Sequence, residues 1–156
     1  MKILKYLMIF LVTVSLSTTT WAKRSTPTST PSLTHAVFIE VNHYRRLHGL
    51  SPLVMSPLLN QEALIHSRRM AQHRIPFGHQ GFDQRIKHIQ REVLGYRAGA
   101  ENVAYRYPSA KIVVDGWMHS SGHRRNILGH YHWTGIGIAY DKQGHPYYTQ
   151  MFMRTE

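Results

Sequence analysis

The side chains best suited to chemistry in this chain gather in two short segments. Glu101 stands in the segment 99–104, whereas Ser120 and His123 stand in the segment 117–128. A further imidazole, His79, lies about twenty residues before the first segment. A carboxylate, a hydroxyl and imidazoles are the groups that line a polar cleft, where they transfer protons or hold a ligand. A glutamate that enters a buried strand or turn needs a partner, because an unpaired buried carboxylate is costly.

Two alternative sets of catalytic or metal-binding residues lie around residue 120. His119 and His123 have the i, i+4 spacing of one helical face, and His130 with His132 could add metal ligands. Position 120 is serine, so the helical zinc-protease pattern His-Glu-x-x-His is missing. Ser120 near His123 also invites a serine-hydrolase interpretation, but the chain has no Gly-x-Ser-x-Gly elbow. Neither set establishes catalysis by itself.

Caps and helical spacing predict the helices that must position these groups. Thr34 can cap a first helix that stops near Gly49, and Ser56-Pro57 begins a second that continues to about residue 70. A short helix is expected over 82–90. Ser109 can cap a fourth that ends near residue 122.

The last third of the chain changes from helical to alternating periodicity. Over 133–140, larger residues alternate with the small residues Gly135, Gly137 and Ala139, which let a helix or a ligand approach the backbone. A turn at 141–144 and a second alternating run at 147–153 predict an antiparallel hairpin. Helices first and a hairpin last indicate an α+β domain.

The amino terminus predicts export. Lys2 and Lys5 flank the start of an apolar run over 6–16, and Ala22 ends a small-residue cleavage site. We expect a signal peptide over 1–22, a leader rich in Ser, Thr and Pro over 23–33, and one domain over 34–156. The apolar run is too short for a transmembrane anchor. With no cysteine in the chain, the core must be stable without disulfides.

The charge balance favours anionic partners. The chain carries 19 Lys and Arg side chains against 8 Asp and Glu, and removal of Lys2 and Lys5 leaves 17 basic groups and a formal charge of +9. Such an excess suits an anionic envelope component. No RNP, zinc-finger or helix-turn-helix pattern points to nucleic acid.

The order of the motifs resembles the CAP superfamily, that of cysteine-rich secretory proteins, antigen 5 and pathogenesis-related 1 (SCP-like domain), in its bacterial branch. The resemblance extends from Ala36 to Phe152. The matching residues are Asn42, Arg45, Gly49-Leu50-x-Pro52-Leu53, Ala63-x-x-His66-Ser67-x-x-Met70-Ala71, His79-x-Gly81-Phe82-x-x-Arg85, Glu101-Asn102-Val103-Ala104, Trp117-x-x-Ser120-x-x-His123-Arg124-x-Asn126-Ile127-Leu128, Gly135-x-Gly137 and Tyr148-Thr149-Gln150-x-Phe152.

The resemblance implies a three-layer α-β-α sandwich in which helices cover both faces of a small antiparallel sheet. It also implies a cleft that in other members carries two His and two Glu and can hold zinc. By that correspondence His79 and His123 are the two histidines and Glu101 is the first glutamate. Ser120 takes the place of the second glutamate, which predicts weak zinc binding or none.

Two arrangements of this cleft stay open at the level of sequence. His79, His123 and Glu101 could supply three ligands to zinc and leave a position for water. Alternatively, the two imidazoles could hydrogen-bond Glu101 in a metal-free pocket. Asn126 and Gln150 are neutral groups that could orient a ligand in the same groove.

Three functions follow from the resemblance and the charge. The first is an exported, periplasmic or extracellular, non-catalytic module that binds an amphiphilic or envelope ligand, with apolar faces around Trp117 and Tyr148 lining the groove. The second is a metal-assisted, protease-like hydrolase. The third is an interaction protein at the cell surface.

Overall fold

The computed structural model describes residues 32–156. The predicted signal peptide and most of the predicted leader lie outside these residues. The elements, in chain order, are α1 (Leu33–Leu47), β1 (Val54–Met55), α2 (Pro57–Ala71), α3 (Phe82–Glu92), β2 (Tyr96–Tyr105), α4 (Ala110–His119), α5 (Ser121–Ile127), β3 (Trp133–Tyr140) and β4 (Pro146–Thr155).

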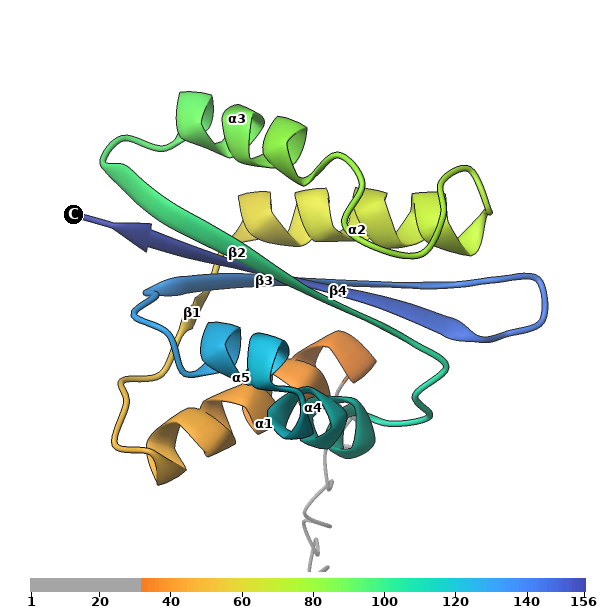
Figure 1. Ribbon diagram of the computed structural model, residues 1–156, viewed down its shortest axis with the longest axis horizontal. Helices are drawn as coiled ribbons and strands as arrows, with labels where there is room; N and C mark the ends of the chain where they lie inside the picture. Colours follow the sequence, from red (N-terminus) through yellow and green to blue (C-terminus); the bar gives the residue numbers. More distant parts are fainter. Residues whose placement is uncertain (1–31) are drawn as a thin grey trace, which may run out of the picture.

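The elements form three layers, as the α+β sandwich prediction requires. Helices α2 and α3 lie on one side of the sheet, and α1, α4 and α5 lie on the other (Figure 1). The strand order is β1-β3-β4-β2, so β2 is an edge strand. The sheet is antiparallel, as predicted, except that the short strand β1 pairs in parallel with β3. This parallel pair is only two residues on each strand, too short to leave a periodic signal in the sequence.

Two predicted helix boundaries need correction. Helix α1 is capped by Ser32, whose side chain accepts a hydrogen bond from the His35 N–H, and not by Thr34. Ser32 and Leu33 therefore belong to the folded domain rather than to the leader. The fourth predicted helix ends earlier than expected, at His119, because Ser120 has an extended backbone (φ −100°, ψ 119°); a separate helix that was not predicted, α5, begins at Ser121.

The break at Ser120 follows from the local sequence. Ser120, Ser121 and Gly122 are three consecutive residues of weak helix propensity, so the chain can turn there at little cost. The consequence is that His119 and His123 lie on different helices. The alternative in which the two imidazoles form an i, i+4 metal pair on one helical face is therefore wrong.

The small residues of β3 let α2 approach the sheet closely, one of the two explanations that the sequence left open. A Cβ atom at Gly135 would lie 2.2 Å from the Leu59 carbonyl carbon, and one at Gly137 would lie 2.1 Å from the Leu64 nitrogen. Helix, not ligand, occupies this face of the strand.

The core divides between the two faces of the sheet. On the α1, α4 and α5 side the largest fully buried side chains are Trp117, Tyr148 and Phe152. On the α2 and α3 side, Leu59, Ala63, Ile89, Met151 and Met153 form a smaller cluster. Among the described residues, no helix combines the length and the apolar character needed to cross a membrane.

Candidate functional site at the edge of strand β2

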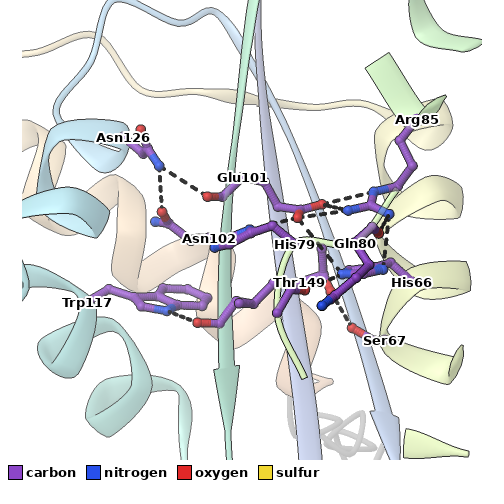
Figure 2. A network of polar contacts seen from close by, with 12 residues as sticks. His66, Ser67, His79, Gln80, Arg85, Glu101, Asn102, Trp117, Asn126 and Thr149 are labelled. Carbon is purple, nitrogen blue, oxygen red and sulfur yellow. Dashed lines mark hydrogen bonds and ion pairs between the residues drawn. The ribbon is translucent and has the colours of Figure 1, made fainter. Parts of the chain in front are cut away.

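Glu101 is the centre of a buried polar network on the α2 and α3 side of the sheet (Figure 2). Its side chain is only 1% exposed and is paired with the guanidinium of Arg85 on α3. Arg85 Nε donates to Oε2 at 3.0 Å, and Nη2 donates to Oε1 at 2.8 Å and to Oε2 at 2.6 Å. A buried carboxylate is tolerable only with such pairing, so this ion pair explains how Glu101 stays in the core.

The remaining donors of Arg85 fix the protonation state of His66 on α2. Arg85 Nη1 donates to the Gln80 carbonyl at 2.9 Å and contacts His66 Nδ1 at 3.0 Å. Because arginine only donates, His66 Nδ1 must be the acceptor, and the proton must lie on Nε2, 2.8 Å from the Gly78 carbonyl. Burial and the Arg85 charge lower the pKa of His66, which keeps the ring neutral.

His79 is held by the same carboxylate but faces outward. Its Nδ1 lies 2.9 Å from Glu101 Oε1, and its side chain is 52% exposed. Since the ionised carboxylate only accepts, Nδ1 carries the proton, and the Nε2 of the neutral ring keeps a free lone pair. An imidazole oriented in this way by a carboxylate can accept a proton or bind a ligand.

A second set of polar contacts lies on the opposite face of β2, because successive side chains of a strand point to opposite faces. Asn126 on α5 donates to the Glu101 carbonyl at 3.2 Å and to Asn102 Oδ1 at 2.8 Å. Asn102 Nδ2 in turn donates to the His123 carbonyl at 3.2 Å. These bonds fasten α5 to β2 and thereby position His123.

Two backbone carbonyl groups on the outer edge of β2, those of Glu101 and Val103, are covered by side chains. In an antiparallel pair, alternate residues direct their backbone groups away from the partner strand, and for β2 these residues include Glu101, Val103 and Tyr105. Asn126 covers the Glu101 carbonyl, and Trp117 Nε1 donates to the Val103 carbonyl at 3.2 Å. The covered carbonyls prevent regular addition of another strand at this edge.

A cleft of about 380 Å³ runs along this edge between the two helical layers. Its walls are mostly apolar or aromatic, and Ser120 and His123 supply the polar side chains. Burial lowers the pKa of His123, and the positive charge that His79 can acquire lowers it further. The lining residues are Phe77, Val103, Ala104, Tyr105, Tyr107, Gly116, Trp117, Ser120 and His123.

The structure brings most of the predicted site residues to this edge. His79 contacts Glu101 directly, Ser120 and His123 line the cleft, and Asn126 anchors the strand beneath it. Gln150 is placed elsewhere. It is fully buried, and its Nε2 donates to Thr134 Oγ1 at 3.2 Å inside the core, so it does not orient a ligand in the groove.

Trp117 lines the cleft as expected, but Tyr148 supports it from below. Tyr148 is fully buried, and its hydroxyl donates to the Tyr107 carbonyl at 2.6 Å. The hydrogen bond holds the segment that carries the Tyr107 side chain, which forms one wall of the cleft.

Residues 32–156 contain no group of three or more His, Asp or Glu side chains arranged to hold a metal ion. The oxygens of Glu101 are engaged by Arg85 and His79, so this residue orients His79 rather than standing free as a ligand. Glu101 therefore does not fit the predicted zinc set. Zinc binding by His79 and His123 stays a prediction.

Sequence reasoning assigned no role to Arg85 or His66, although both belong to matched motifs. The expected burial of Glu101 could have indicated that a cationic side chain pairs with it, because a buried carboxylate needs a cationic partner. Which of the 13 arginines supplies it depends on the packing of α3 over β2 and is not a local property of the sequence.

The three-layer α-β-α arrangement is that of an SCP-like domain. The family model for the cysteine-rich secretory protein family (CAP) matches residues 38–152, and the chain belongs to this family. It does so without a single cysteine.

The relatives found by sequence are bacterial. The chain is 32% identical over 147 residues to the uncharacterized protein YkwD of Bacillus subtilis, and the match covers 90% of this chain and 56% of that protein. It is 29% identical over 115 residues to the uncharacterized membrane protein YlbC of the same organism, covering 72% of this chain and 32% of YlbC. The chain thus corresponds to only part of these relatives.

Solved structures confirm the fold. An extracellular SCP-domain protein of Bacillus anthracis superimposes with a TM-score of 0.67 at 29% identity, covering 79% of this chain and 40% of that one. An outer surface protein of Borrelia burgdorferi gives a TM-score of 0.68 at 16% identity, covering 80% of this chain and 93% of that one. At this low identity the second match shows the fold alone.

Proposed function

We propose that this protein is an exported binding module whose β2-edge cleft takes up an amphiphilic molecule. The observation that carries the proposal is the cleft itself, in which aromatic walls surround a small number of fixed polar groups. Phe77, Tyr105, Tyr107 and Trp117 provide the apolar surface, and His123 provides a polar side chain. Ligand pockets in proteins combine an apolar lining with a few placed polar groups in this way, and 380 Å³ lies within their usual range.

The network beneath the cleft supports a binding role because it makes the walls rigid. Trp117 is held by the Val103 carbonyl, and α5 is held by the Asn102 and Asn126 side chains. A preformed pocket loses little conformational entropy when a ligand enters. Export is supported by the charged and apolar start of the sequence and by the extracellular protein of Bacillus anthracis that shares the fold.

The cleft can be blocked without disturbing the network. Ser120 lines the cleft, has an extended backbone, and makes no capping hydrogen bond to α5, so a larger side chain at this position projects into the cavity. We expect Ser120→Phe to weaken binding of a dodecyl amphiphile by at least about tenfold. The free energy of unfolding should change by less than about 1 kcal/mol.

Ser121→Phe is the matched control. Ser121 is exposed, is not among the lining residues, and differs from Ser120 by one position. The affinity for the dodecyl amphiphile and the free energy of unfolding are measured for the wild type and both variants, by equilibrium binding and by denaturant unfolding. Equal affinity of Ser120→Phe and wild type would place the ligand outside this cleft.

A second function, hydrolysis, is favoured by the orientation of His79. Its Nδ1 is held by Glu101 and its Nε2 is free, which is the arrangement of a general base. If the protein hydrolyses esters or peptides, His79→Gln should abolish turnover, whereas His88→Gln should not. His88 is the control because it forms a similar pair, 2.8 Å from Glu62, outside the cleft. A panel of fluorogenic esters and peptides tests this directly.

A further inference from the structure

Arg106 directly follows β2, between two residues that line the cleft. Its backbone lies in the left-handed region at φ 66°, which only one other non-glycine residue of the described chain, His73, shares with it. A non-glycine residue in this conformation costs on the order of 1 kcal/mol. Glycine would remove this cost, so arginine at this position is destabilising for the fold.

The Arg106 guanidinium is held against an aromatic ring. Its central carbon lies 5.0 Å from the centroid of the Tyr105 ring, and the Tyr105 ring itself packs against Tyr147 at a centroid distance of 4.3 Å. Stacking of this kind orients the guanidinium while leaving its N–H groups available for bidentate contacts. The residue is exposed, and none of the ion pairs within residues 32–156 includes it.

The open edge of β2 beside Arg106 presents backbone donors to the cleft. The alternation of β2 directs the N–H and C=O groups of Val103 and Tyr105 toward this edge, and the Val103 carbonyl is covered by Trp117. The two N–H groups and the neighbouring guanidinium suit a ligand group that accepts several hydrogen bonds. Carboxylates and phosphates are groups of this kind.

We propose that Arg106 makes the cleft selective for amphiphiles with an anionic head group, a carboxylate or a phosphate, whose apolar part lies against the aromatic walls. This proposal rests on the proposed function, since it names the ligand class and the selective residue of the same cleft. The strained backbone of Arg106 is then the structural cost of holding the guanidinium against Tyr105, a residue that lines the cleft.

The test compares four probes at concentrations below micelle formation: dodecyl phosphate, dodecanoate, neutral dodecyl maltoside and inorganic phosphate. Wild type should bind both anionic amphiphiles at least about tenfold more tightly than dodecyl maltoside. Arg106→Gly should lower the affinity for the anionic amphiphiles to that for the neutral one. Because glycine suits a φ of 66°, this variant should be at least as stable as wild type.

Arg68→Ala is the control for overall charge, since it removes one exposed positive charge from α2 in the other layer. It should retain the preference for anionic amphiphiles. Equal binding of anionic and neutral amphiphiles by wild type, or an unchanged preference in Arg106→Gly, would overturn the proposal and leave the proposed function intact. Inorganic phosphate that binds as tightly as dodecyl phosphate would also overturn it. Failure of every amphiphile to bind wild type would overturn the proposed function itself.

Discussion

At the scale of single residues, Arg85 accounts for the chemistry of the site. Its contacts neutralise Glu101, fix the tautomer of His66, and hold the Gln80 carbonyl in the loop that carries His79. Glu101 in turn orients His79, the member of this network whose side chain is most exposed. The solvent-accessible group of this network is therefore an imidazole held in place by buried charges, not a carboxylate open to solvent.

His66 gives this network a pH dependence. Its pKa is lowered from 6.5, chiefly by burial and then by Arg85, so below pH 6.5 the unfolded chain binds a proton that the folded protein excludes. The free energy of unfolding should therefore fall as the pH drops below 6.5, by at most about 1.4 kcal/mol per pH unit for this one group.

His66→Gln provides the comparison, because a glutamine amide can accept from Arg85 and donate to the Gly78 carbonyl without titrating. Urea unfolding between pH 7 and pH 5 should show a shallower decline for the variant than for wild type. Identical declines would assign the acid sensitivity to other groups, such as His123, whose pKa is also lowered.

At the scale of elements, periodicity and capping residues predicted those helices and strands whose signals lie in the local sequence. The second helix, the β3–β4 hairpin and the small-residue face of β3 are confirmed. Strand β2 was expected only as a strand or turn around Glu101. The reason is that residues 101–104 are buried on both faces of the sheet, which removes the alternation by which a half-buried strand is recognised.

The packing of β3 on α2 makes a sharp prediction. Gly137→Ala would place a Cβ atom 2.1 Å from the Leu64 nitrogen and 2.2 Å from the Ala63 carbonyl carbon, both backbone atoms that cannot move independently. We expect a loss of about 3 kcal/mol in the free energy of unfolding, at the upper end of typical overpacking costs.

Gly122→Ala is the matched control, since its Cβ atom would meet nothing within 4 Å and alanine is the better helix former within α5. It should be neutral or stabilising by up to about 1 kcal/mol. Denaturant unfolding of both variants provides the measurement. Equal stability of the two would mean that α2 does not rest on β3 as closely as the structure shows.

At the scale of the whole molecule, the cleft depends on the strand order. The edge position of β2 lets the Phe77–His79 loop from one layer and the α4–α5 segment from the other meet across a single strand. The sequence predicted His79, Glu101 and His123 as site residues through their family motifs. It could not predict that Gln150, in a matched motif of its own, is sealed in the core, because strand order and side-chain direction are set by contacts between distant segments.

The molecule also has a competing apolar groove. It measures about 530 Å³, lies where β2 begins, and includes the fully exposed Leu94 together with Trp133 and Met153. This groove is larger than the β2-edge cleft. It is remote from the His79 and Glu101 network in the fold. Its polar side chains come from Ser56, Thr155 and Glu156. The two grooves are therefore alternative binding sites for an amphiphile, and an experiment must distinguish them.

The most direct test of the binding account is an NMR titration of the isotope-labelled protein with dodecyl phosphate below its micelle-forming concentration. The account predicts saturable chemical-shift changes concentrated at Tyr105, Tyr107, Gly116, Trp117 and His123, and their loss in Ser120→Phe. Changes concentrated at Leu94, Trp133 and Met153, with the β2-edge residues unaffected, would contradict it.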